Sequence, residues 1–189
     1  MQGNLVSNSQ LIRLVDQRVI DINPFEPNRA QLAHYPLDPE SFLVWKDKDW
    51  IPAHSFINNP KPFDLEPGQY VIVEVRQQIA PGQGIVGLFI PSSNLIEQGL
   101  SLTAGKISFP FGQNNERIRF GLRNNLSESR SLKPGDLVAY VQFFDLTSSD
   151  MIPYALSDRD MEIYKQRRLA IAADDGVWAL YDKEPDAPV

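Results

Sequence analysis

Residues 85–124 constrain the fold of this chain more than any other stretch of its sequence. Short apolar runs alternate there with glycine, proline, serine and asparagine, which are residues that turns prefer. Apolar runs of this length between turn residues predict short strands rather than helices. The chain has fifteen prolines and eleven glycines, which indicates many turns. We therefore expect a mainly β fold.

A polar segment follows the apolar run 86–90 within this stretch. Pro91, Ser92, Ser93 and Asn94 place two hydroxyl groups and several backbone N–H groups at the end of an expected strand. Such groups can hold an anion. The same residues are typical of a polar turn between two strands. From these residues alone both interpretations stay open.

The order of motifs in and around this stretch resembles the dCTP deaminase and dUTPase superfamily. The matching residues extend over roughly 7–146. In chain order they include Phe63, Leu65, Pro67-Gly68, Val71, Gly87, Ser92-Ser93, Gly99-Leu100, Ala104-Gly105, Ile107, Phe111, Leu122-Arg123-Asn124, Leu132, Pro134-Gly135 and Phe143-Phe144.

The resemblance implies a distorted β-barrel or jelly-roll that forms a homotrimer with sites between subunits. In this family a Ser-Ser pair binds nucleotide phosphate, and the segment after it shapes the pocket for the base and sugar. A nucleotide of the dCTP or dUTP class is therefore the expected ligand. No cofactor is assigned, and magnesium is compatible with such a nucleotide without being required by the sequence. The candidate nucleotide- and phosphate-binding residues are Ser92, Ser93, Lys106, Ile107, Phe111, Arg117, Arg119 and Tyr140.

The sequence departs from this family at positions where the family has acids. The catalytic glutamate corresponds to Gly121, a second pocket acid to Ser108, and the aspartate of the N-terminal motif to Pro36. An arginine that follows the Ser-Ser pair in deaminases falls at or near Glu97. Water is a poor nucleophile at neutral pH without a base, and loss of a well-placed general base costs about 10²–10⁴ in rate.

Three functions therefore remain open, and no catalytic residue is assigned. The first is a trimer that binds a nucleotide or phosphate but has lost catalysis. The second is a working dCTP deaminase, or a related nucleotide hydrolase, with relocated acids such as Glu97, Glu116 or Asp145. The third is a structural or assembly protein without a ligand.

Composition excludes several other classes of protein. A net charge of −6 argues against a general nucleic-acid binder, because such proteins carry basic surfaces. The chain has no cysteine, which excludes disulfides and the zinc-dependent nucleoside deaminases with paired cysteine ligands. No signal peptide and no apolar run of membrane-spanning length is present. We therefore expect a cytoplasmic protein without a membrane partner.

Two regions are expected, a β domain over 1–150 and a C-terminal helix and tail over 151–189. Ser7 or Ser9 can cap a first helix over 10–17. Ser157 and Asp158 can cap a second helix that continues to about Ala173 and packs on the domain or braces the trimer. Strands are expected over 41–45, 70–75, 116–122 and 137–144, and a polar turn over 126–133.

Overall fold

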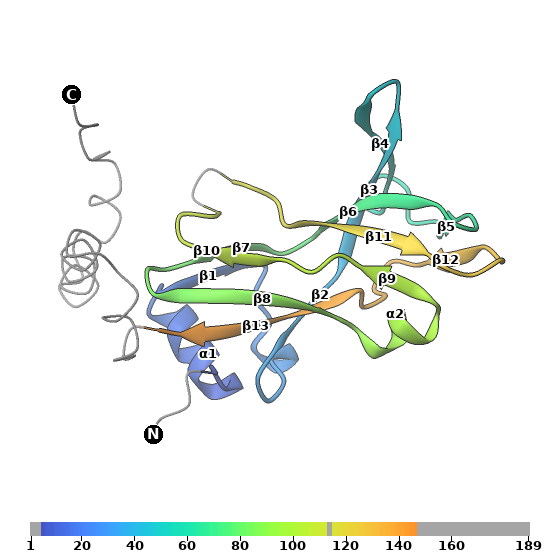
Figure 1. Ribbon diagram of the computed structural model, residues 1–189. Coiled ribbons are helices and arrows are strands. Elements are labelled where there is room, and N and C mark those ends of the chain that lie inside the picture. Colours follow the sequence, from blue (N-terminus) through green and yellow to red (C-terminus); the bar gives the residue numbers. More distant parts are fainter. Residues whose placement is uncertain (1–4, 113–114, 147–189) are drawn as a thin grey trace, which may run out of the picture.

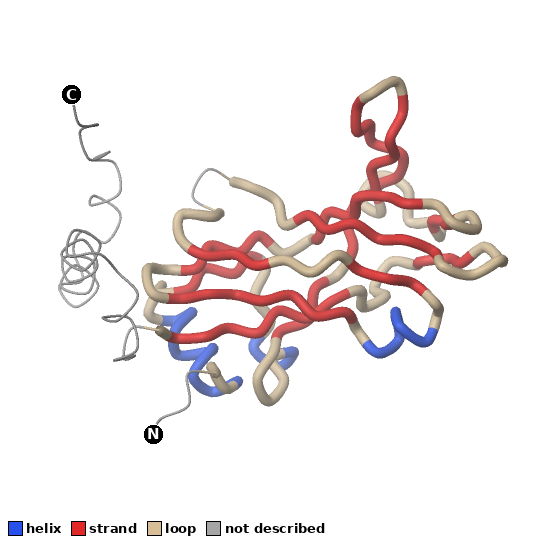
Figure 2. Tube along the Cα trace, in the orientation of Figure 1, coloured by secondary structure: helices blue, strands red, loops and turns tan. Residues whose placement is uncertain are grey.

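The computed structural model describes residues 5–112 and 115–146. Strands dominate these residues, and the helices lie at the margins of the sheets (Figures 1 and 2). The prediction of a mainly β fold is confirmed, whereas the predicted C-terminal helix and tail lie outside the described residues. The elements are α1 (Asn8–Asp16), β1 (Ile20–Asn23), η1 (Pro27–Arg29), β2 (Tyr35–Leu37), β3 (Pro39–Lys46), β4 (Asp49–Ser55), β5 (Phe63–Leu65), β6 (Tyr70–Val75), β7 (Gln78–Pro81), β8 (Ile85–Pro91), α2 (Ser93–Glu97), β9 (Leu100–Leu102), β10 (Lys106–Ser108), β11 (Arg119–Asn124), β12 (Arg130–Leu132) and β13 (Ala139–Asp145).

Two larger sheets carry most of the strands (Figure 1). One has the strand order β10-β8-β13-β2, and the other has the order β4-β3-β6-β11-β9. The pairs β1-β7 and β12-β5 form two small sheets. The rings of Phe89 on β8 and Phe120 on β11 lie 6.5 Å apart, so the inner faces of the two larger sheets meet. Strand pairing within the described residues does not join these sheets into one closed barrel.

The core follows the two-residue alternation of the strands. On β6 the inward side chains are fully buried, and they are Val71, Val73 and Val75. Each lies opposite β11 or β3 in an antiparallel ladder. Burial of one such side chain stabilises the folded state by about 1.5–3 kcal/mol. The alternate side chains of β6 are left to form an outer face of the sheet.

The first predicted helix is present, but it begins at Asn8, two residues before the predicted start. The hydroxyl of Ser7 accepts a hydrogen bond from the Gln10 N–H at 3.3 Å, and the Gln10 side chain accepts one from the Ser7 N–H at 2.9 Å. This reciprocal pair satisfies two N–H groups that the helix would otherwise leave unpaired. Ser7, rather than Ser9, is therefore the cap of α1. Leu11 anchors the helix in the core.

The central stretch is not made of strands and turns alone, so that part of the prediction is wrong. Residues 93–97 form the short helix α2. The Ser92 hydroxyl accepts a hydrogen bond from the Leu95 N–H at 3.1 Å, and Leu95 is buried beneath the helix. A capping serine followed by a buried leucine is sufficient to favour one helical turn over an open turn.

Two other predicted boundaries also need correction. The strand expected over 116–122 is β11, which begins only at Arg119, because the Glu116 carboxylate accepts a hydrogen bond from the Gly112 N–H at 2.9 Å in the preceding turn. The polar turn expected over 126–133 contains β12, in which Leu132 is buried and Ser131 bonds to the carboxylate of Asp64 on β5. Pairing with a distant strand stabilises β12.

Candidate functional site

A hollow of about 340 Å³ lies on the outer face of the five-stranded sheet. Strand register places Gly121 of β11 opposite Ile72 of β6, and Arg119 opposite Glu74. Residues two apart on a strand share a face, so these side chains meet outside the core. We name this site the Gly121 hollow. Its lining residues are Leu43, Trp50, Tyr70, Ile72, Thr103, Arg119, Phe120 and Gly121.

Because Gly121 has no side chain, the Tyr70 ring can lie directly over it. A Cβ atom added to Gly121 would lie 1.7 Å from the Tyr70 hydroxyl oxygen and 2.3 Å from Tyr70 Cζ. Any side chain at this position would therefore force the Tyr70 ring to move. The phenol of Tyr70 thus lies in the space into which the acid expected from the resemblance would extend.

Aromatic rings form one wall of the Gly121 hollow. The hairpin of β3 and β4 projects from the rest of the molecule (Figure 1). It brings the Trp50 ring to 5.9 Å from Tyr70 and 5.4 Å from Trp45, which is itself 59% exposed. Aromatic rings contribute large apolar contact areas and prefer offset or edge-to-face partners. The wall is therefore suited to a planar, partly apolar group.

A charged network borders the hollow. The guanidinium of Arg119 approaches Glu74 Oε1 at 2.8 Å through Nε and 2.7 Å through Nη2, and the Ser41 hydroxyl donates to Glu74 Oε2 at 2.5 Å. Burial of Glu74 raises the pKa of its carboxyl. The hydrogen bonds from Ser41 and Arg119, with the charges of Arg119 and Arg117, outweigh burial and hold that pKa below its usual value.

Thr103 adds a hydroxyl group to the lining. Its Oγ1 accepts a hydrogen bond from the Gly121 N–H at 2.7 Å, and its own N–H donates to the Gly121 carbonyl at 2.9 Å. Two bonds to the same glycine hold the side chain in place beside β11. The Thr103 hydroxyl proton remains available for another acceptor.

The two serines predicted to hold phosphate have different positions. Ser92 is 1% exposed, and its hydroxyl donates to the Leu137 carbonyl at 2.6 Å while it caps α2. Its hydroxyl is thus directed into the protein and used there. Ser93 is exposed as the first residue of α2. The structure therefore leaves Ser93 as the accessible hydroxyl of the pair.

A second, polar groove of about 660 Å³ lies beside α2. It shares no lining residue with the Gly121 hollow. Both signs of charge are present, since Arg130 and Lys133 lie there with Glu97 and Asp136. The remaining lining residues are Asn94, Gln98, Ser129 and Ser131.

Three more of the predicted site residues lie on the four-stranded sheet. Lys106 is exposed on β10, whereas the Ile107 side chain is buried in the core. Tyr140 of β13 lies on the outer side, with its ring 4.2 Å from the ring of His34 in an edge-on contact. None of these three side chains lines the Gly121 hollow.

The last predicted residues lie nearer to β11. Phe111 is half-buried and packs against the core. Arg117 pairs with Glu40 at 3.0 Å just before β11 begins. Of the eight candidate residues, only Arg119 lines the Gly121 hollow. The aromatic residues that dominate it, Trp50 and Tyr70, were not predicted. The alternation of Val71, Val73 and Val75 on β6 could have placed Tyr70 on the outer face, but Trp50 lies on β4 and only the sheet brings it to Tyr70.

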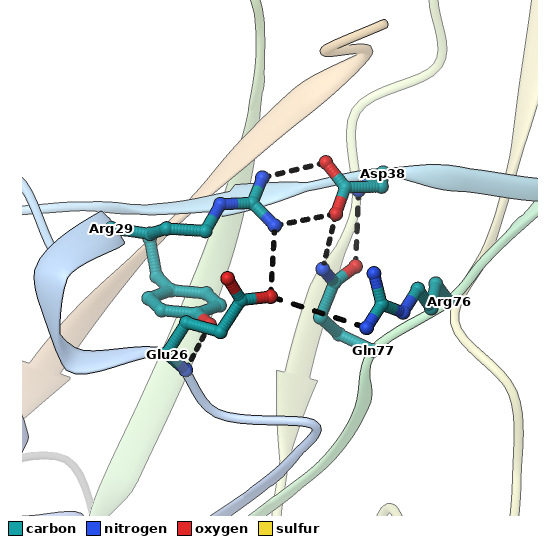
Figure 3. Close-up of polar contacts among 6 residues, drawn as sticks. Glu26, Arg29, Asp38, Arg76 and Gln77 are labelled. Carbon is teal, nitrogen blue, oxygen red and sulfur yellow. Dashed lines mark hydrogen bonds and ion pairs between the residues drawn. The ribbon is translucent and has the colours of Figure 1, made fainter. Parts of the chain in front are cut away.

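A buried acid lies two residues beyond Pro36 and was also not predicted. Asp38 receives two hydrogen bonds of 2.6 Å from the Arg29 guanidinium and one of 2.9 Å from the Gln77 amide (Figure 3). The Asp38 N–H in turn donates to the Gln77 side-chain carbonyl at 3.0 Å. The bond to Asp38, opposed by partial burial, raises the pKa of Arg29 above its usual value. Asp38, directly before β3, is therefore held both to Arg29 of η1 and to Gln77 directly before β7.

The acids proposed as relocated catalytic groups do not lie at the Gly121 hollow. Glu97 borders the polar groove, Glu116 accepts a hydrogen bond from Gly112, and Asp145 ends β13. None of the described residues that line the Gly121 hollow is acidic.

Within residues 5–112 and 115–146, no cluster of three or more His, Asp or Glu side chains could hold a metal ion. Neither described helix is both long and apolar enough to cross a bilayer.

Comparison with known proteins reveals similarity in structure but not in sequence. No protein-family model and no curated protein sequence matches the chain. The 2'-deoxycytidine 5'-triphosphate deaminase of Agrobacterium tumefaciens superposes with a TM-score of 0.58 at 10% identity, over 76% of this chain and 49% of that one. A dUTPase mutant from phage phi11 of S. aureus gives 0.48 at 14% identity, over 67% and 90% of the two chains. The dUTPase of Streptococcus mutans gives 0.46 at 16% identity, over 67% and 94%.

This chain spans about half the length of the Agrobacterium deaminase chain. The superposition with the deaminase shows that the described residues have a dCTP deaminase-like β fold.

Proposed function

We propose that this protein is a trimeric nucleotide-binding member of this fold that lacks the catalytic acids. The nucleotide would be of the dCTP or dUTP class. The observation that carries the proposal is the Gly121 hollow, where the phenol of Tyr70 lies in the place of an acid and none of the described lining residues has a carboxylate.

The shape and chemistry of the hollow support binding of a base. Its volume of about 340 Å³ lies at the lower end of the range of small-molecule pockets, about 300–1,000 Å³. Trp50 and Tyr70 offer ring surfaces, and Thr103 and Arg119 offer hydrogen-bond donors at its border. A planar heteroaromatic ring with polar edges fits this combination.

Glu74, which lies opposite Arg119 on β6, is unsuited to proton abstraction. Glu74 is held ionised by Arg119 and Ser41, with a pKa below its usual value. A carboxylate of lowered pKa is a weaker base, and its oxygens already accept hydrogen bonds. The expected result is binding of nucleotide without deamination or hydrolysis.

The proposed phosphate contact requires a second subunit. Ser93 begins α2 next to the polar groove, and this groove shares no residue with the Gly121 hollow. One chain therefore supports a base contact and a phosphate contact at separate places. We propose that a homotrimer brings the Ser93 region of one subunit to the hollow of the next. Magnesium would be bound with the triphosphate.

Thermal unfolding with dCTP or dUTP, each with and without magnesium, tests binding. A ligand present at 100 times its dissociation constant stabilises the folded state by about 2.7 kcal/mol, or about 5–10 °C for a chain of this size. Arg119→Gln should reduce this shift. Arg123→Gln is the matched control, because Arg123 is exposed on the same face of β11 but does not line the hollow. No shift with any nucleotide would favour a structural role without a ligand.

Release of ammonia and of diphosphate tests the absence of catalysis. The purified protein should show no turnover above buffer with either nucleotide. Turnover that disappears in Glu97→Ala or Glu116→Ala would instead establish an enzyme with relocated acids. A monomer in light-scattering measurements that binds nucleotide at full affinity would exclude the site between subunits.

A further inference from the structure

The outer side of β8 and β13, the two central strands of the four-stranded sheet, is mostly apolar, although their inner side already belongs to the core. On β8 and β13 buried side chains alternate with half-buried or exposed ones. Strand register aligns the outward side chains of the two strands in pairs. We name this surface the β8–β13 face; it consists of Val86, Leu88, Ile90, Tyr140, Gln142 and Phe144.

This composition is unusual for a sheet that faces water. An antiparallel sheet with one face on the core normally presents polar side chains on the other. Here Gln142 is the polar member of the face, and Leu88 is 38% exposed. Leu5, which is 40% exposed, bridges to Phe144 and extends the apolar row. Contiguous apolar surface of this kind marks a contact site.

We propose that residues 147–189 of the same chain dock on the β8–β13 face. The first reason is where the described chain ends. β13 is itself half of the face, and the Leu146 N–H donates to the Gly84 carbonyl at 2.8 Å, directly before β8 begins. β8 and β13 lie side by side along their length (Figure 1). The described chain therefore ends at the margin of the face.

The second reason is length and pattern. The sequence predicts a helix over 157–173, which would be about 25 Å long at the rise of an α-helix. The seven residues of β13 span about 23 Å. A helix of this length can cover the face from end to end, and ten residues between Leu146 and residue 157 allow the chain to turn back. The apolar residues of the predicted helix include Met161, Tyr164, Leu169 and Ile171.

The third reason is charge. Lys106 of β10 lies opposite Leu88 and is exposed at the margin of the β8–β13 face. Residues 147–189 contain nine aspartates and glutamates against five lysines and arginines. Six of the nine acids lie outside the predicted helix, at residue 150 and over 174–186, so the segments that flank the helix supply the negative charge that suits a cation at the margin of the face. The proposal is independent of nucleotide binding, because the Gly121 hollow lies on the other large sheet.

The full chain has no cysteine, so single cysteines can report on the face directly. Leu88→Cys is the probe, and Ile51→Cys is the matched control, because Leu88 and Ile51 are 38% and 36% exposed in the described residues. In the full chain we expect a thiol reagent to label L88C about tenfold more slowly than I51C, since labelling then requires the docked segment to open. Equal labelling rates would overturn the proposal.

Cross-linking then identifies the occupant. A thiol-linked benzophenone is attached to L88C, and long incubation drives the labelling to completion. Labelled full-length chains grown in ¹⁴N and in ¹⁵N medium are then mixed, irradiated and digested. Cross-linked peptides from residues 147–189 with the same isotope as the Leu88 peptide are expected. Mixed-isotope cross-links, or cross-links to any other segment, would assign the face to a second copy and overturn the proposal. The same label on I51C should give no cross-link to residues 147–189.

Discussion

Asp38 provides the sharpest test of how the fold is held together. Replacing Asp38 with alanine removes two charge-assisted hydrogen bonds from Arg29 and one from Gln77, and it leaves the fully buried Gln77 amide without this acceptor. A buried polar group left unsatisfied costs about 1–3 kcal/mol. Breaking a fully buried ion pair costs about 3–5 kcal/mol. Because Arg29 is 26% exposed and can turn to water, we expect a total loss of about 3 kcal/mol, at the lower end of that range.

Urea unfolding measures this loss. With a slope of about 2 kcal/mol per M, the midpoint should fall by about 1.5 M in Asp38→Ala. Arg29→Ala should cost about as much, because it leaves the more buried Asp38 carboxylate without its cation, and the double variant should cost less than the sum of the two. Asp49→Ala is the control, since Asp49 is an exposed residue at the start of β4. A loss below about 1 kcal/mol in Asp38→Ala, or strict additivity with Arg29→Ala, would refute a structural role for this carboxylate.

Three further predictions follow from single positions. Ser92→Ala should lower the free energy of unfolding by about 1–3 kcal/mol, because it removes the cap of α2 and the bond to the Leu137 carbonyl, whereas Ser93→Ala should cost at most about 0.5 kcal/mol; urea unfolding compares them. Gly121→Ala should displace the Tyr70 ring and weaken the thermal shift with nucleotide; an unchanged shift would contradict the assigned hollow. The folded-state pKa of Glu74 is lowered, so its stabilising contribution is complete above the ordinary value of 4.5 and is lost as pH falls through the folded-state value. Glu74→Gln should therefore weaken the fall of the unfolding free energy at acid pH. An unchanged dependence on pH would contradict the ion pair.

The known activities of similar folds do not decide what this chain does. The structure differs between Gly121 and Pro36, two positions at which the resemblance implies an acid that the sequence lacks. At Gly121 the Tyr70 phenol from the neighbouring strand lies in the space that a side chain would take. At Pro36 the carboxylate of Asp38, two residues further along, bonds to Arg29 and Gln77 and so has a structural role. In the sequence, both positions look the same, because each lacks the acid that the resemblance implies. Turnover assays remain the measurement that decides catalysis.

The sequence by itself determined the features that depend on neighbours along the chain. Alternation of apolar residues predicted β6, β8 and β13, and a serine before an amphipathic run predicted α1, because strand periodicity and helix capping are local effects. The order of short motifs predicted the β fold of the dCTP deaminases and dUTPases. Local reasoning was insufficient for the short elements α2 and β12. Each is stabilised by a buried leucine, and β12 is also stabilised by pairing with the distant strand β5.

Only the tertiary structure decided the contents of the candidate site. Asp38 and Gln77 are 39 residues apart in sequence, and Tyr70 reaches Gly121 because β6 and β11 pair in one particular register. A shift of that register by one residue would turn Tyr70 toward the core and leave the space over Gly121 open. Strand pairing, rather than the pattern of any single strand, therefore sets which side chains share the outer face of the sheet.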